Sequence, residues 1–279
     1  MHGMHARTPK NFVLEERLER YADVIELVPR AYRGRWAEAC HPIGTTGPGC
    51  YESVHLDLGC GKGAYLVERA HHSPRMLFVG VDEEPLCIAY TAQAISEQQL
   101  PNAVVVPARG DGICAVFGPG ELASLSLNFP TPFPRKRDAM RRLVILERLL
   151  EYGEVLGTGG VLTLRTDSLP LFRFALTQFE LAGYELLEIC EDAPRHWHGE
   201  PETEYERKLR AQGASVFAIA ATPGKPPHPP VQTAELSLVA YLPEDLEALG
   251  YVPHGMQGTV FNLRNRRKRE QRRHRSSPS

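Results

Sequence analysis

The sequence predicts an α/β fold, a doubly wound and mostly parallel sheet of the Rossmann-like type with a small C-terminal α/β appendage. Strand-like apolar runs alternate with segments of helical spacing across residues 51–222. A glycine-rich turn follows the first of these runs, at a place where parallel sheets often bind nucleotides. The chain has 279 residues, of which 42% are hydrophobic and 24% charged, so it is long enough for one large domain with appendages.

The individual elements follow from the spacing of apolar residues. A helical arm is expected first, over residues 13–27. Short apolar and β-branched runs then predict strands at 53–60, 76–82, 102–108, 124–129 and 159–167, and a closing pair of strands at 184–190 and 215–222. The segments between them predict helices at 63–73, 84–99, 140–156 and 169–183. Such alternation is typical of a parallel sheet covered by helices.

Composition also divides the chain into regions. We expect an N-terminal helical arm and linker at 1–50, the main domain at 51–222, a proline-rich linker at 223–230, a small strand–helix–strand appendage at 231–263, and a basic tail without regular structure at 264–279. Five of the eight residues in the linker are proline, which favours an extended conformation.

The net charge of −2 conceals a strong asymmetry. Residues 264–275 hold eight of the 32 Lys and Arg residues and one of the 34 Asp and Glu residues, so the remaining 267 residues carry 24 basic and 33 acidic groups. An acidic body with a basic end indicates a polyanionic partner that is met through local patches. A solvated end without a partner is the alternative for the tail taken alone.

Other features limit the class of protein. No apolar run approaches the roughly 18–20 residues that span a bilayer, and the first twelve residues lack the apolar core of a signal peptide. We therefore expect a cytoplasmic protein without a membrane partner. The six cysteines form no C-x-x-C pair, which fits a reducing compartment. We expect no metal site, because the nearest candidate, Cys190 with His196 and His198, lacks a second ligand cluster.

The glycine turn, "LDLGCGKGAYL", carries Asp57, Gly59, Gly61 and Gly63. Glycine permits positive φ and a close approach of the backbone to a ligand. With an acid two residues before its first glycine, the turn is similar to the loop of S-adenosylmethionine (SAM) methyltransferases. A carboxylate at this position suits the positive charges of SAM. Asp82, at the end of the second strand, can accept hydrogen bonds from both ribose hydroxyls. A dinucleotide oxidoreductase and a turn without a ligand remain as alternatives.

A second motif makes the resemblance specific. The run "LNFPTPFPRKRDAMRRL", residues 127–143, resembles the N-F-x-D-P-W-P-K-K-R-H-x-K-R-R-L motif of bacterial tRNA (guanine-N7)-methyltransferases. "LRTDSLPLF", "TEYERKLRAQG" and "AYRGRW" resemble three further motifs of that family in the same order, over about residues 5–222. The resemblance implies the class I methyltransferase fold, SAM as cofactor and methyl transfer to guanosine N7 in the variable loop of tRNA. It leaves the oligomeric state open between monomer and homodimer.

The resemblance and the residue chemistry together assign roles. We expect the cofactor to contact Asp57, Gly59, Gly61, Gly63, Asp82, Glu83, Arg109, Asp111 and Asn128. The guanosine would be held by Arg135, Asp167, Thr203, Glu204, Tyr205 and Glu206, because carboxylates accept the N–H donors of the guanine Watson–Crick edge. RNA phosphates would be met by Lys136, Arg137, Arg141 and Arg142.

The chain departs from the family pattern at two positions where the family motifs carry an acid. Thr131 stands where the family motif has an aspartate, and Arg109 aligns with a family acid. We expect Thr131 and Asp138 at the catalytic position and Asp111 in contact with the adenine amino group. Two alternatives follow, a catalytically weak or inactive RNA-binding protein on a methyltransferase fold and a SAM-dependent methyltransferase of a small molecule.

Overall fold

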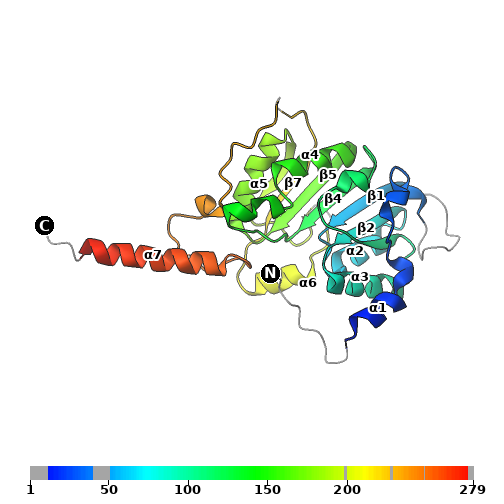
Figure 1. The fold of residues 1–279 in the computed structure, drawn as a ribbon, viewed down its shortest axis with the longest axis horizontal. Coiled ribbons are helices and arrows are strands. Elements are labelled where there is room, and N and C mark those ends of the chain that lie inside the picture. The colour runs from blue at the N-terminus through cyan, green and yellow to red at the C-terminus, as the bar shows by residue number, and fades with distance from the viewer. Residues whose placement is uncertain (1–11, 40–50, 198–199, 227–228, 248, 276–279) are drawn as a thin grey trace.

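The sheet predicted from the sequence is present. The computed structural model describes residues 12–39, 51–197, 200–226, 229–247 and 249–275. Within them, seven strands form one sheet in the order β3-β2-β1-β4-β5-β7-β6 (Figure 1). The strands are β1 (Ser53–Leu58), β2 (Met76–Asp82), β3 (Ala103–Pro107), β4 (Leu122–Asn128), β5 (Leu156–Thr166), β6 (Glu185–Cys190) and β7 (Phe217–Thr222). Neighbours from β3 to β5 pair in parallel, and β7 pairs antiparallel with both β5 and β6, which confirms the predicted closing pair.

Helices cover both faces of the sheet, so its central strands are buried. On one face lie α1 (Leu14–Arg20), α2 (Ala64–His72) and α3 (Pro85–Glu97), and on the other lie α4 (Leu146–Val155) and α5 (Leu169–Leu181) (Figure 1). Burial on both faces explains why β2 and β3 are almost continuously apolar instead of alternating. Two expected helices are shorter than predicted: α1 ends at Arg20, and α4 begins at Leu146 after a 3-10 helix at Lys136–Arg141.

The C-terminal segment differs most from the expectation. Residues 231–256 contain a 3-10 helix at Leu238–Tyr241, and their described part holds no strand. α7 (Gln257–Arg275) follows, so residues 264–275, which we expected to lack regular structure, are helical. Leu238 and Met256 are fully buried in the main core, so the segment packs on the domain and is not a separate unit. In the described residues, no helix is both long and apolar enough to cross a membrane.

Candidate functional site

The predicted site residues gather at one rim of the sheet. β1, β2, β4 and β5 run in parallel, so their carboxyl ends, near Leu58, Asp82, Asn128 and Thr166, lie at the same edge. The chain order reverses between β1 and β4, where the connections leave to opposite sides. Ligands of open α/β sheets bind in the crevice at this kind of switch point.

The glycine turn is held in shape by the end of β2. Gly59, Gly61 and Gly63 have φ values of 78°, 58° and 77°, a region in which other residues are strained. The Gly61 backbone N–H donates to Asp82 Oδ2 at 2.9 Å, and the Glu84 N–H donates to Oδ1 at 2.9 Å. Asp82 therefore fixes the turn and the start of α3, and its remaining lone pairs are available to a ligand.

A cavity of about 490 Å³ opens beside this turn. It brings together several predicted site residues from four strand ends: Gly59, Asp82, Glu83, Arg109, Asp111, Asn128, Thr131 and Arg141. Phe129, Pro130, Phe133, Met140 and Arg148 complete much of the lining. Its volume lies in the range of roughly 300–1,000 Å³ that is common for small-molecule sites.

Opposite charges alternate along the outer wall of the cavity. Arg109 Nε lies 3.6 Å from Glu83 Oε2 and 3.4 Å from Asp111 Oδ1. Arg148 Nη2 lies 3.9 Å from Asp111 Oδ2 and also pairs with Glu151. Arg109, Glu83 and Asp111 are exposed, so the two pairs of Arg109 add little stability, whereas Arg148 is partly buried. The carboxylates of Glu83 and Asp111 line the cavity where a polar ligand could meet them, with Arg109 between them.

Asp57 lies beneath the cavity and does not line it. Its carboxyl is buried, and burial raises its pKa to about 7 although a hydrogen bond from Asn128 favours the ionised form. The Asn128 Nδ2 donates to Asp57 Oδ1 at 3.3 Å. Gly61 and Gly63 also lie outside the lining, and a Cβ on Gly63 would come within 2.7 Å of Thr91. In this structure these residues support the glycine turn, and their direct contact with a ligand stays a prediction.

A buried polar chain joins the cofactor turn to the "TEYE" segment. Arg165 Nε donates to Asn128 Oδ1 at 2.9 Å, and Arg165 Nη1 lies 3.2 Å from Glu206 Oε2. Glu206 also pairs with Arg210 at 2.8 Å and is almost fully buried. Both carboxylate oxygens of Glu206 are therefore paired inside the protein, and its assignment to guanosine stays a prediction.

The other residues of this segment have mixed outcomes. Thr203 is the N-cap of α6 (Glu204–Ala211), and its hydroxyl accepts from the Glu206 N–H at 2.9 Å. It is buried and supports the helix in this structure, and its contact with guanosine stays a prediction. Glu204 is exposed and pairs with Lys208, which lowers its pKa. Tyr205 remains available, as described below.

The proline-rich loop is strained and clamped. Phe129 and Phe133 have φ values of 51° and 44°, which cost about 1–3 kcal/mol each in a non-glycine residue. Arg142 donates to the Pro132 carbonyl at 3.1 Å and to the Phe133 carbonyl at 2.7 Å, and its guanidinium lies 4.5 Å from the centre of the Phe174 ring. Burial lowers the pKa of Arg142 to about 10. The Arg142 side chain is buried in the loop that it holds, and its assignment to RNA phosphate stays a prediction.

The remaining predicted phosphate contacts are exposed. The short 3-10 helix beside the cavity and the residue before it carry four exposed cations, Arg135, Lys136, Arg137 and Arg141. Arg141 stacks on Phe133 at 4.2 Å, and Arg137 Nε lies 3.9 Å from Asp138. Asp138 is half-buried and lies outside the lining of the cavity, so it does not take the place of the family aspartate there.

An aromatic cluster adjoins the cavity on the side of α6. The Tyr205 ring packs edge-on against Phe129, which itself lines the cavity, with ring centres 5.3 Å apart. Burial raises the pKa of Tyr205 to about 12, and the charge of Asp167 contributes. Tyr251 Oη donates to Asp167 Oδ2 at 2.5 Å, so the C-terminal segment reaches a residue that we assigned to guanosine.

Sequence reasoning missed two residues of this site, Arg165 and Tyr251, and did not anticipate the burial of Arg142. Arg142 and Arg165 are arginines of the resemblance motifs, but a sequence does not distinguish an exposed cation from one that faces carbonyls inside a loop. Tyr251 lies beyond the residues that carry the resemblance, so no motif pointed to it. The side chain of His198 lies outside the described residues, and among those described no group of three or more His, Cys, Asp or Glu residues could hold a metal ion.

The fold and the rim cavity define a class of Rossmann-like domain that binds a nucleotide-type ligand, and comparison with known proteins narrows it. The family model "Putative methyltransferase" matches residues 51–219. A tRNA (guanine-N(7)-)-methyltransferase of Geobacillus thermodenitrificans (strain NG80-2) is 30% identical over 208 residues, which cover 74% of this chain and 93% of that protein. The protein of the same name from Streptococcus equi subsp. equi (strain 4047) is 29% identical and covers 77% of this chain and 99% of that protein. Among solved structures, the 16S rRNA methyltransferase KamB has a TM-score of 0.48 and 19% identity, covering 63% of this chain and 89% of that chain.

The chain belongs to this methyltransferase family, and the resemblance to the tRNA (guanine-N7)-methyltransferases is confirmed. The match to the family model ends at residue 219. The C-terminal segment that contacts Asp167 therefore lies outside the part of the chain that defines the family.

Proposed function

We propose that the protein transfers a methyl group from SAM to N7 of a guanosine in the variable loop of tRNA. The observation that carries this proposal is the position of Phe129, which lines the cavity beside the glycine turn and also packs on Tyr205 near Asp167. A donor bound in the cavity and a purine bound at the aromatic cluster would share one crevice. Family membership and the names of the relatives support the same reaction.

The residues present suit SAM. The cavity has the volume of a small-molecule site, and Asp82, Glu83 and Asp111 supply carboxylates along it. Asp82 would accept hydrogen bonds from the ribose hydroxyls, and Asp111 would accept one from the adenine amino group. SAM, when bound, supplies an electrophilic methyl group on a positively charged sulfur. The three carboxylates can face that charge, while Arg109, Arg141 and Arg148 balance them elsewhere in the lining.

The protein needs little acid–base chemistry for this reaction. Guanine N7 carries an in-plane lone pair and no proton, so no group has to remove one. Thr131, which replaces the family aspartate, lines the cavity and can offer a hydrogen bond without charge. The residues would contribute chiefly by holding both reactants in line and by excluding water. The carboxylate of Asp167 would also stabilise the positive charge that the purine acquires.

Asp167 and Tyr205 would recognise the base, and the exposed cations would hold its backbone. Asp167 accepts hydrogen bonds, which matches the N1–H and N2–H donors of guanine. Arg135, Lys136, Arg137 and Arg141 stand beside the same crevice, where phosphate contacts would fix the position of the RNA without reading its sequence.

The test combines calorimetry with transfer of labelled methyl groups to an unmodified tRNA transcript. We expect the wild type to bind SAM and to label the tRNA, and we expect Asp167→Asn to bind SAM normally but to label tRNA poorly. Asp192→Asn, at an exposed carboxylate, serves as the matched control and should behave as the wild type. RNA binding without SAM binding would select the non-catalytic alternative. SAM binding without RNA binding would select a small-molecule substrate.

A further inference from the structure

The C-terminal segment contacts the site through residues 251–256 and ends in a strongly basic helix. Three contacts fix it to the rim: the Tyr251 hydroxyl donates to Asp167 at 2.5 Å, the Ser168 hydroxyl donates to Met256 Sδ at 3.4 Å, and Gly255 lies so close to Pro132 that a Cβ would come within 3.3 Å of its ring. Met256 is fully buried. α7 starts at the next residue, so the direction of the helix is set next to the crevice.

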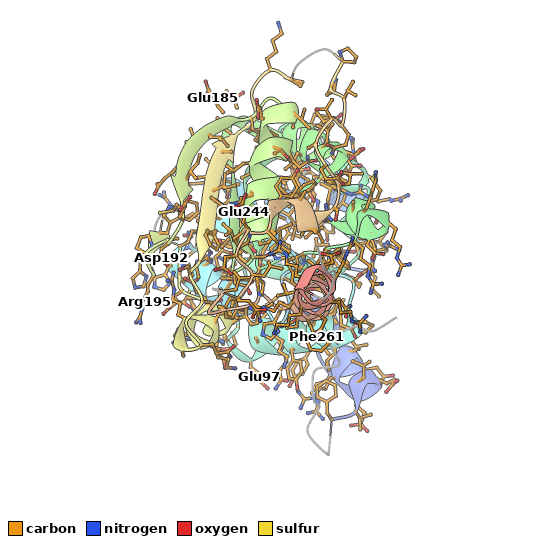
Figure 2. The ribbon with its side chains drawn as sticks, turned by 90° about the vertical axis from the view of Figure 1, so that its left-hand side faces the viewer. Glu97, Glu185, Asp192, Arg195, Glu244 and Phe261 are labelled. Carbon is orange, nitrogen blue, oxygen red and sulfur yellow. The ribbon has the colours of Figure 1, made fainter. Side chains whose placement is uncertain are left out.

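α7 then projects away from the body. Figure 1 shows it extending from the domain toward its C-terminal end, and Figure 2 looks almost along its axis, with Phe261 labelled beside it. A helix of 19 residues is about 28 Å long at about 1.5 Å per residue. It therefore extends the reach of the protein well beyond the cavity.

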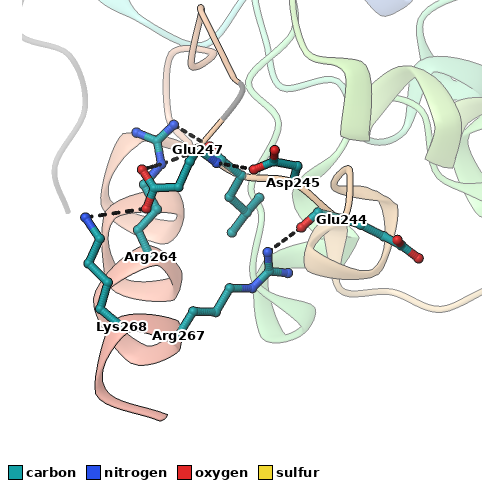
Figure 3. Close-up of a pocket in the computed structure, with 7 residues that line it drawn as sticks. Glu244, Asp245, Glu247, Arg264, Arg267 and Lys268 are labelled. Carbon is teal, nitrogen blue, oxygen red and sulfur yellow. Dashed lines mark hydrogen bonds and ion pairs between the residues drawn. The ribbon is translucent and has the colours of Figure 1, made fainter. Parts of the chain in front are cut away.

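The base of the helix is braced by a neighbouring acidic segment. Arg264 Nε donates to the Leu246 carbonyl at 3.0 Å, Lys268 Nζ lies 3.5 Å from Glu247, and Arg267 donates to the Glu244 carbonyl (Figure 3). These contacts hold one side of α7 to residues 244–247. They also leave other cations free to meet a partner.

The charge that faces solvent has few partners in the protein. Arg266 pairs with Glu270 on the same helix, an exposed pair that contributes little. Arg269 is exposed and forms no ion pair or hydrogen bond with another described residue. Eight of the twelve residues from 264 to 275 are Lys or Arg and one is Glu, whereas the rest of the chain has a balance of −9. The positive charge is therefore concentrated on one arm.

We propose that α7 is an RNA-binding arm that contacts the phosphate backbone of the same tRNA whose guanosine enters the site. This inference rests on the proposed function, because the RNA is the polyanion that the crevice at the base of the helix would take. The helix is polar almost all round, with the exposed Phe261 isolated, so it lacks the apolar face by which a helix lies on a lipid surface. Closely spaced guanidinium groups are suited to phosphate oxygens.

The test removes charge from the arm without touching the site. Arg266→Gln with Arg269→Gln keeps residues of good helix propensity and removes two positive charges. The matched control, Arg20→Gln with Arg75→Gln, removes two exposed charges elsewhere: Arg75 precedes β2 at the opposite rim, and Arg20 ends α1. Glu270→Lys adds two units of positive charge to the arm and is the complementary variant.

Binding of the full-length variants to a labelled unmodified tRNA is measured by fluorescence anisotropy over a series of salt concentrations. Each lost phosphate contact lowers the slope of log affinity against log salt by about 0.7–0.9, so the slope of the arm variant should fall by up to about 1.8 and its affinity about tenfold at low salt. Glu270→Lys should bind more tightly with a steeper slope. SAM affinity should not change in any variant.

Equal RNA binding by the arm variant and its control would overturn the proposal, and so would an equal loss in both. Unfolding midpoints close to that of the wild type show that the variants remain folded. This result is distinguishable from failure of the proposed function. If the wild-type protein does not methylate tRNA, the proposed reaction is refuted. If the wild type methylates tRNA and the arm variant binds tRNA with unchanged affinity, only the proposal about the arm is refuted.

Discussion

At the scale of single residues, the site depends on carboxylates in unequal surroundings. Asp82 and Asp111 line the cavity, Asp57 is buried beneath it, and Asp167 is nearly buried under Tyr251. Burial disfavours the charged form of a carboxyl group. Burial therefore raises the pKa of Asp57, which its sequence motif alone did not indicate.

The pKa of Asp57 makes stability depend on pH. Its folded value of about 7 lies above its unfolded value of about 4, so between these values the folded protein binds more protons than the unfolded chain. The contribution is present below about pH 4 and is lost as pH rises through about 7. We expect the free energy of unfolding of Asp57→Asn to rise relative to that of the wild type across this range, as measured by urea denaturation at several pH values. A difference that is constant with pH would contradict this account.

Tyr251 should orient Asp167 for the base. Burial and the neighbouring Asp167 raise the pKa of Tyr251, so its hydroxyl remains a donor at neutral pH. A hydrogen bond to a charged group contributes about 1.5–3 kcal/mol, so we expect Tyr251→Phe to raise KM for tRNA by about tenfold while kcat and SAM affinity change little. Steady-state kinetics with tRNA as the varied substrate provides the measurement. A lower KM would mean that the hydroxyl blocks the site and does not support it.

At the scale of elements, the proline-rich loop shows how strain is maintained beside a site. Phe133 stays in a left-handed conformation because its carbonyl and that of Pro132 are held by Arg142. A guanidinium can bind both carbonyls and pack on an aromatic ring, which an ammonium cannot do with the same geometry.

We therefore expect Arg142→Lys to lower the free energy of unfolding by about 2–3 kcal/mol and to reduce methyl transfer strongly. Arg137→Lys, on the exposed side of the 3-10 helix that ends just before Arg142, should change stability by no more than about 0.5 kcal/mol. Denaturation curves and initial rates of both proteins decide the question. Similar results for the two substitutions would show that the clamp is unimportant.

The C-terminal segment should behave as part of the domain. Met256, just before α7, is fully buried in the main core, whereas Phe261 in the first turns of α7 is 65% exposed. Removing buried methionine atoms leaves a cavity, so Met256→Ala should cost about 2–5 kcal/mol, whereas Phe261→Ala should cost about 0.5 kcal/mol or less. Thermal and chemical denaturation measure both. Equal small effects would indicate a segment that is only loosely attached.

These elements also show what the sequence could predict. The strands of residues 53–222 were predictable because buried parallel strands are nearly continuous apolar runs, and β3 and β2 are clear examples. The rim cavity was predictable because glycines and acids follow strand ends. The roles of Arg142, Arg165 and Glu206 were not, because pairing inside a protein depends on tertiary contacts. α7 was not predicted because its charge pattern is also typical of an unstructured tail.

At the scale of the whole molecule, the distribution of charge follows the shape of the molecule. The acidic body carries the cavity at one rim of the sheet, and the basic arm leaves from that rim (Figure 1). A buried chain from Asp57 through Asn128 and Arg165 to Glu206 links the two sides of the crevice. Under the proposed function, this arrangement would place the methyl donor, the purine and the phosphate-binding cations along one crevice.

The most direct measurement is mass spectrometry of an unmodified tRNA transcript after incubation with the purified protein and SAM, with nuclease mapping of the modified nucleotide. The account predicts 7-methylguanosine at one guanosine of the variable loop, at a level that depends on both protein and SAM. Methylation at another atom, or no methylation by a folded protein that binds both SAM and the tRNA, would contradict it.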